Sequence, residues 1–113
     1  MSVGRIDNAP VAKPMMEQEF RFRPIKKTLA GDITVAYNEP PVQVLDCNGS
    51  ARNVTLPVAA AAYEGYMFMF FNISGTAVAA TVKDAGVTIA TVAQGKAAIV
   101  VCDGGTWRAM TGA

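Results

Sequence analysis

Residues 66–71 read YMFMFF, and this short stretch constrains the fold more than any other part of the chain. In a β-strand, successive side chains face opposite sides, so residues 66, 68 and 70 point one way and residues 67, 69 and 71 the other. Both faces of this strand are then apolar, whereas an antiparallel sheet normally leaves one face in water. Either a second layer with a helix or a neighbouring subunit must cover the extra face. For a chain of 113 residues we expect the subunit.

The composition also favours an oligomer. Hydrophobic residues make up 51% of the chain and charged residues 17%, against about 25% charged residues in an average globular protein. A domain of this size hides only about 60% of the surface of its unfolded chain. Residues 97–102 (AAIVVC) are apolar on both sides as well. We predict a subunit interface that contains Tyr66, Met67, Met69 and Phe71.

From residue 31 onward, short strand-like runs alternate with turn residues such as Asn48-Gly49 and Ser74-Gly75. A spacing of about 8–12 residues per strand and turn is typical of a sandwich or barrel. The sequence therefore predicts an all-β fold, a compact antiparallel β-sandwich or barrel-like domain with one short helical turn in residues 57–63. The domain is expected to span residues 31–113, with strands near residues 33–37, 42–46, 53–56, 66–72, 77–83, 87–92, 97–103 and 106–110.

Residues 1–30 differ from this pattern and are predicted to form an extended N-terminal arm. Pro10, Pro14 and Pro24 interrupt any long helix or central strand. Residues 17–23 (EQEFRFR) alternate polar with aromatic, which suits a strand added to the sheet edge of a partner. An arm folded back on its own domain is the alternative. The residues expected to contact the partner are Ile6, Val11, Met15, Met16, Phe20, Arg21, Phe22, Arg23 and Ile25.

The sequence offers little catalytic or metal chemistry. It has no histidine, which is the commonest general base and metal ligand. Cys47 and Cys102 have apolar neighbours and are expected to be small core residues. A net charge of +1 and the lack of a long apolar segment argue against nucleic-acid and membrane partners. We expect no enzyme activity, no cofactor and no metal, in a protein made in a reducing cytoplasm.

A series of short motifs resembles the small β-domains of tailed-bacteriophage virion proteins. The resemblance covers roughly residues 42–108 and implies a structural virion part, usually a trimer, on a compact antiparallel β-fold. Similar patterns occur in head-decoration, head-fibre and tail-fibre proteins. The motifs are a strand that ends at Asp46, VTLP at residues 54–57, Gly65 before the aromatic strand that ends at Asn72, the Ser74-Gly75 turn, and DGGTW at residues 103–107.

Decoration proteins that this chain resembles often use an N-terminal arm to clamp neighbouring capsid subunits. The resemblance therefore implies a capsid decoration (cement) protein that binds the outside of the assembled phage head as a homotrimer. It would stabilise contacts between major capsid subunits. The alternative is a head-fibre or tail-fibre module that binds a host glycan through Trp107 and Tyr63. A single tryptophan behind a hairpin is more often a packing residue, and we expect that role for Trp107.

Overall fold

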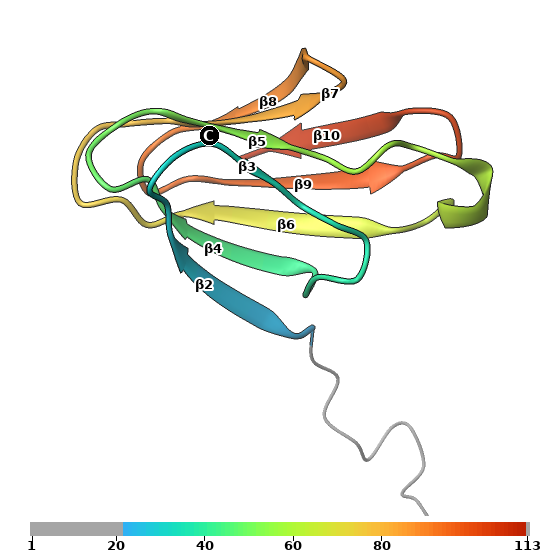
Figure 1. The fold of residues 1–113 in the computed structure, drawn as a ribbon, viewed down its shortest axis with the longest axis horizontal. Helices are drawn as coiled ribbons and strands as arrows, with labels where there is room; N and C mark the ends of the chain where they lie inside the picture. Colours follow the sequence, from blue (N-terminus) through green and yellow to red (C-terminus); the bar gives the residue numbers. More distant parts are fainter. Residues whose placement is uncertain (1–21, 113) are drawn as a thin grey trace, which may run out of the picture.

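A computed structural model describes residues 22–112, which form two β-sheets packed face to face (Figure 1). The five-stranded sheet has the strand order β10-β9-β6-β4-β2, and the four-stranded sheet has the order β3-β5-β7-β8. The predicted all-β fold with one short helical turn is confirmed. The elements are β2 (Pro24–Thr28), β3 (Ile33–Thr34), β4 (Val42–Asp46), β5 (Arg52–Thr55), the 3₁₀ helix η2 (Ala61–Tyr63), β6 (Met67–Asn72), β7 (Ala80–Asp84), β8 (Val87–Val92), β9 (Ala97–Cys102) and β10 (Trp107–Thr111).

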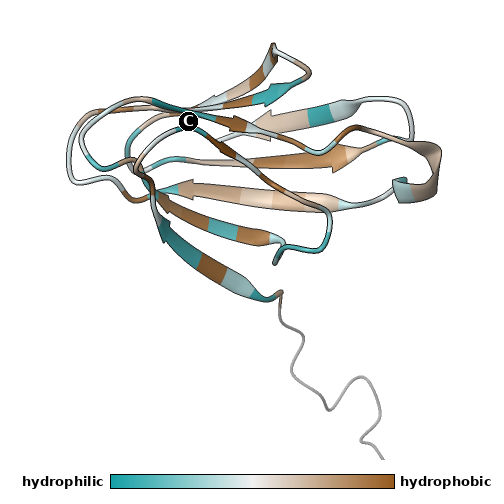
Figure 2. Ribbon diagram, in the orientation of Figure 1, coloured by the Kyte–Doolittle hydropathy of each residue, from teal (hydrophilic) through white to brown (hydrophobic). Residues whose placement is uncertain are grey.

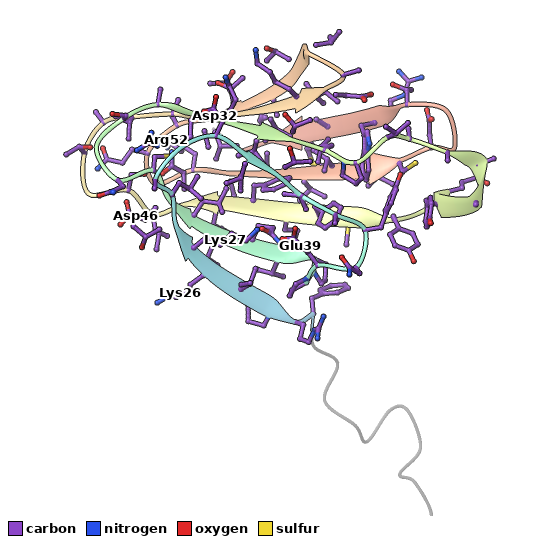
Figure 3. All side chains as sticks on the ribbon, in the orientation of Figure 1. Lys26, Lys27, Asp32, Glu39, Asp46 and Arg52 are labelled. Carbon is purple, nitrogen blue, oxygen red and sulfur yellow. The ribbon has the colours of Figure 1, made fainter. Side chains whose placement is uncertain are left out.

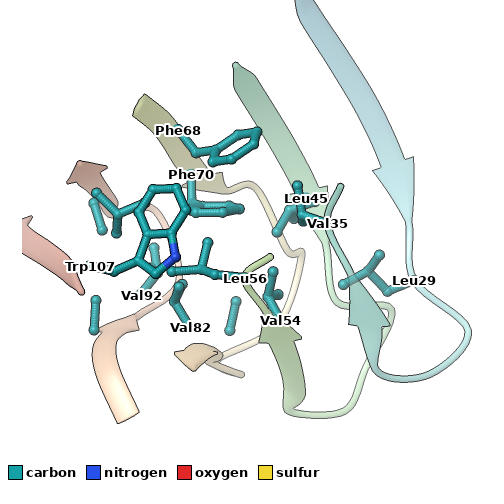
Figure 4. Close-up of a cluster of buried hydrophobic side chains, with 14 of the residues drawn as sticks. Leu29, Val35, Leu45, Val54, Leu56, Phe68, Phe70, Val82, Val92 and Trp107 are labelled. Carbon is teal, nitrogen blue, oxygen red and sulfur yellow. The ribbon is translucent and has the colours of Figure 1, made fainter. Parts of the chain in front are cut away.

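The core lies between the two sheets and is built from alternate residues of the strands (Figure 4). Phe68 and Phe70 of β6 enter it from one sheet, and Val54 and Val82 enter it from the other. Each of these side chains is no more than 1% exposed. Burying a side chain of this size contributes roughly 1.5–3 kcal/mol. The β-branched and aromatic residues that predicted strands therefore also supply the contacts that hold the two sheets together.

From β2 to β7 the chain alternates between the sheets. It lays β2, β4 and β6 side by side and parallel in one sheet, and β3, β5 and β7 parallel in the other. Parallel neighbours need a crossover connection, and here each crossover contains a strand of the opposite sheet. The chain then closes with two hairpins, β7–β8 in the four-stranded sheet and β9–β10 in the five-stranded sheet.

The prediction of antiparallel sheets is wrong for four of the seven strand pairings in residues 22–112, which are parallel, and correct for three. The predicted turn at Asn48-Gly49 is confirmed, because these residues have φ angles of 58° and 84°. This turn, however, leads from β4 in one sheet to β5 in the other, so it closes no hairpin. Local turn chemistry determines where the chain reverses, whereas the sheet that the next strand joins depends on packing of distant segments.

The predicted boundary between arm and domain at residue 30 is also wrong. β2 pairs with β4 from Pro24 opposite Val42 to Thr28 opposite Asp46, and Leu29 is a core residue that is 2% exposed. Pro24 does not prevent this strand, because proline is tolerated at the first position of an edge strand. The folded domain thus includes residues 24–30.

Candidate interaction surface

The outward side of the five-stranded sheet is apolar. Burial alternates along β6 and β9, so residues 67, 69 and 71 and residues 97, 99 and 101 point away from the core. Strand register aligns them, with Met69 opposite Val42 on one side and Ile99 on the other, and Ile99 opposite Met110. We call this surface the apolar face. Its members are Val42, Val44, Met67, Met69, Phe71, Ala97, Ile99, Val101 and Met110.

The second sheet packs on the opposite side, so residues 22–112 leave the apolar face uncovered. Phe71 is 39% exposed and Met110 is 68% exposed. Figure 2 shows pale brown colouring along most of β6 and stronger brown, hydrophobic colouring along much of β9. At one end of the face, a hollow of about 390 Å³ is lined by residues that include Phe71, Ile73 and Lys96.

The structure brings three of the four predicted interface residues together on this face, namely Met67, Met69 and Phe71. Tyr66 lies apart from them, because it precedes β6 and packs edge-on against Tyr37 and Tyr63. Residues 97, 99 and 101 of β9 also lie on this face, although the predicted interface contains only residues of the 66–71 stretch. No sequence pattern predicts that Met110 lies on the apolar face, because only the pairing of β10 with β9 places it beside Ile99.

Of the residues predicted to form the contact arm, three lie within the described range. Phe22 and Arg23 precede β2, and the backbone carbonyl of Arg23 accepts a hydrogen bond from the Val42 N–H (3.2 Å). Ile25 lies within β2, half-buried, with its side chain on the inner side of the sheet. The others lie outside the described residues: Ile6, Val11, Met15, Met16, Phe20 and Arg21.

The outward side of the four-stranded sheet has the opposite character. Val54 and Val82 point into the core, so their strand neighbours face outward. Cross-strand pairs such as Thr81 with Thr91 continue this side across the sheet. Hydroxyl, amide and amino groups therefore replace the methionine, phenylalanine and isoleucine of the apolar face. We call this surface the polar face, and its members are Thr34, Asn53, Thr55, Thr81, Lys83, Thr88 and Thr91.

The edge of β2 is protected against pairing with a further strand. Arg23 and Leu29 form backbone hydrogen bonds with β4. By the alternation of a parallel ladder, Pro24, Lys26 and Thr28 then direct their backbone groups to the open edge. Pro24 has no N–H to offer there. Lysine and proline on an edge strand, together with a charged side chain that points inward, are features that prevent unwanted strand addition.

The inward-pointing charge on β2 is Lys27, which forms an ion pair with Glu39 at 2.5 Å (Figure 3). Glu39 also accepts a hydrogen bond from the Ala36 N–H (3.0 Å). Partial burial acts to raise the pKa of Glu39, but the hydrogen bonds from Lys27 and Ala36 outweigh it and lower that pKa below its ordinary value of 4.5. The ion pair with Lys27 therefore favours the ionised form of the Glu39 carboxylate.

Asn72, at the end of β6, joins the two sheets through a buried hydrogen-bond network. Its amide nitrogen donates to the carbonyls of Val78 and Val92, both at 2.8 Å. Its amide oxygen accepts from the Ser74 backbone N–H and hydroxyl. The Ser74 hydroxyl in turn accepts from the Cys47 N–H (2.8 Å). This network gives a structural reason for the asparagine and serine in the motif at residues 72–75.

Aromatic side chains gather at one end of the sandwich. Tyr37 and Tyr63 stack with ring centroids 3.8 Å apart, and Tyr66 stands perpendicular to both. Burial is the main cause that raises the pKa of Tyr37 to about 12, and its hydroxyl donates to the Val58 carbonyl (2.6 Å). Trp107 is only 3% exposed, and its indole N–H donates to the Pro57 carbonyl (2.8 Å). The predicted packing role of Trp107 is confirmed.

Several carboxylates of the domain serve its local structure. Asp103 accepts hydrogen bonds from Arg108 and from the backbone of Gly105 and Thr106, which together lower its pKa to about 2. Asp32 accepts from the Asn53 N–H in the same way (2.8 Å). In the part of the chain from residue 22 to 112, no three histidine, cysteine or acidic side chains gather in a way that could hold a metal ion.

Both cysteines are buried, as the sequence predicted for core residues, and both are free thiols. Cys47 is 0% exposed and Cys102 is 1% exposed. A thiol without access to solvent is inert towards reagents. Separately, residues 22–112 contain no helix with the length and apolarity needed to span a bilayer.

Comparisons with known proteins assign the chain to no family. No family model matches it, and neither curated proteins nor solved structures give a significant match. The likeness to phage virion domains therefore depends on the short motifs of residues 42–108. The function has to be inferred from the surfaces of the domain.

Proposed function

We propose that this protein is a capsid decoration (cement) protein of a tailed bacteriophage. It binds the outside of the assembled head as a homotrimer and stabilises contacts between major capsid subunits. The observation that supports this most is the pairing of an uncovered apolar face with a polar one on a single small domain. One side of such a domain adheres to protein and the other faces water, which suits a component of an assembly.

An adhesive role rather than a catalytic one also agrees with the acidic groups and thiols of the domain. Asp32, Glu39 and Asp103 accept hydrogen bonds that hold turns and strand ends. General acid–base catalysis needs a group that can reach a substrate and exchange a proton near the working pH. Asp103, with a pKa of about 2, stays ionised well below neutral pH. The two thiols are closed to solvent.

The mechanism of stabilisation is mass action. A protein that binds the assembled shell but not its separated subunits lowers the free energy of the shell. Three linked copies make the second and third contacts intramolecular, so modest single contacts add up to firm attachment. Residues 1–22 precede β2 in the chain, and we assign them the clamp on neighbouring capsid subunits. The basic side chains there make this contact weaken as salt rises.

A fibre module that binds a host glycan is the second candidate, and one observation favours it. Tyr63 and Tyr66 are 36% and 43% exposed at the aromatic end of the sandwich, and exposed aromatic rings stack on the apolar faces of sugars. Trp107, which the sequence offered for this platform, is buried and does not contribute. Mass spectrometry of purified virions separates the two candidates, because a decoration protein is present in hundreds of copies and a fibre module in few.

Co-sedimentation with heads of the phage that encodes the chain tests the proposal. The full chain should pellet with mature heads and raise the temperature at which they disrupt. A variant that lacks residues 2–21 keeps β2 and should fold but bind more weakly; circular dichroism verifies its fold. Replacement of Phe20 by serine in the full chain is the milder companion variant. Equal binding by all three would remove residues 1–21 from the clamp, and no binding by the full chain would contradict the proposed function.

A further inference from the structure

We propose that the apolar face is the contact surface for a second copy of this chain, and that copies meet through this sheet face rather than by pairing strand edges. This proposal extends the proposed function. It depends on that function only for the expected number of copies, which is three. The contact itself follows from the chemistry, shape and edges of the five-stranded sheet.

The charges around the apolar face favour a partner of balanced charge. Lys26, on β2, and Arg108, on β10, lie at its two edges, and Asp46 ends β4 on the same side. Asp103 neutralises Arg108 through a 2.8 Å ion pair. A surface that is apolar in its centre and mixed in sign at its rim is complementary to another copy of itself. The face has no large excess of either charge that would attract a strongly acidic or strongly basic partner.

The shape of the face also fits a second copy. Met110 is 68% exposed and protrudes beside Ile99. The hollow of about 390 Å³ beside Phe71 lies at the end of the same sheet face. A protrusion and a depression on one surface let the methionine of one copy enter the hollow of the next. Methionine is well suited to this because its flexible thioether fills irregular spaces.

Strand edges offer no comparable route to assembly. The β2 edge presents Pro24 and Lys26, and β3 consists of only two residues. At the other side of the sandwich, β8 and β10 lie against each other, so each covers the edge of the other. The domain therefore blocks edge-to-edge pairing while it leaves the apolar face open. Packing of sheet on sheet is the remaining way to bury Phe71 and Met110.

The size of the face sets the expected strength of the contact. Four strands at about 4.8 Å spacing, each about 17–20 Å long, give a flat area of roughly 350 Å². A stable interface takes about 800 Å² from each partner. The apolar face alone therefore gives association that depends on protein concentration.

Light scattering of the full chain without capsids tests this inference separately from the proposed function. We expect the mass to rise with concentration above 11.9 kDa towards 35.7 kDa, three times the chain mass. Met110→Lys and Phe71→Lys should raise the dissociation constant at least about tenfold, because an unpaired charge is then buried at the contact. Thr91→Lys places the same charge on the polar face and should leave the mass unchanged. Circular dichroism checks that each variant folds.

Each outcome decides the inference. A monomer mass up to about 100 µM, which corresponds to very weak binding, overturns it, and so does equal weakening by Thr91→Lys. Selective weakening by Met110→Lys and Phe71→Lys supports it. A dimer that these two variants dissociate supports the face contact but contradicts the trimer of the proposed function. Self-association without binding to phage heads would leave the face contact in place and reject the capsid role.

Discussion

The two sheets of this domain share one core but present opposite surfaces to the outside. The five-stranded sheet exposes methionine, phenylalanine and isoleucine, whereas the four-stranded sheet exposes mainly threonine. Both sheets use the same alternation of buried and outward residues, so folding alone explains the inner sides of both. Only the outward sides differ, and folding requires no apolar residues there. The difference therefore supports the proposal that the apolar face is the side of the molecule that contacts another protein chain.

The largest expected effect comes from two neighbours on β6. Phe70 is 0% exposed in the core and Phe71 is 39% exposed on the apolar face. Phe70→Ala should lower the free energy of unfolding by about 3–5 kcal/mol, because it removes buried area and leaves a cavity. Phe71→Ala should cost the protomer no more than about 1 kcal/mol and weaken self-association instead. Urea denaturation together with light scattering measures both quantities, and equal losses of stability would contradict the assignment of the two faces.

A second substitution tests the buried hydrogen-bond network of Asn72, which joins the two sheets and belongs to neither outward face. Asn72→Ala should lower the free energy of unfolding by about 2–3 kcal/mol, because it leaves the carbonyls of Val78 and Val92 and the backbone N–H of Ser74 without their buried partner. Ser74→Ala should cost less, since it leaves only the Cys47 N–H without its buried partner. If Asn72→Ala left the thermal midpoint unchanged, the network would not hold the sheets together.

The stability contributed by the Lys27–Glu39 ion pair, beside the β2 edge, should decrease in acid. The pKa of Glu39 is lower in the folded protein than its ordinary 4.5, so its ion pair with Lys27 contributes stability above about pH 4.5. That contribution is lost as the pH falls through the lowered pKa. We expect on the order of 1 kcal/mol or less for a partly exposed pair. Thermal midpoints between pH 3 and pH 7 should fall more steeply for the parent protein than for Glu39→Gln; parallel curves would exclude this role.

The smallest effect is expected on the polar face. Thr91→Ser removes an exposed methyl group from β8 and should change stability by no more than about 0.5 kcal/mol, with no effect on association. The same experiment on the apolar face, Val101→Ser, should leave stability similar and reduce association. A clear loss of association in Thr91→Ser would show that the polar face also takes part in assembly.

The sequence predicted what depends on local pattern. The limits of β4 and β8 agree with the expected runs at residues 42–46 and 87–92, and the two apolar sides of residues 66–71 are those of β6. The gap between the expected runs at residues 77–83 and 87–92 is the turn that connects β7 to β8, where Ala85 and Gly86 have φ angles of 50° and 84°. In these segments periodicity and turn chemistry are enough, because each depends on residues close in sequence.

What the sequence did not reveal depends on contacts between distant segments. β2 was missed because Pro24 reads as a strand breaker unless the strand is known to lie at an edge. The parallel pairing of β4 with β6 joins residues about 27 positions apart, which no local signal specifies. Met110 joins the apolar face only through its register with Ile99. The sequence thus identified the outward residues of one strand of the apolar face and missed those of the neighbouring strands.

The most direct test of the central claim compares the accessibility of the two outward faces in the full chain. Cys47 and Cys102 are buried and supply a slow background, so a cysteine placed at Met110 or at Thr91 is the reactive thiol in each variant. As protein concentration rises from about 1 µM to 200 µM, the rate of maleimide labelling at position 110 should fall severalfold while the rate at position 91 stays constant. Equal rates at both positions across this range would contradict the assignment of the apolar face as the contact between copies.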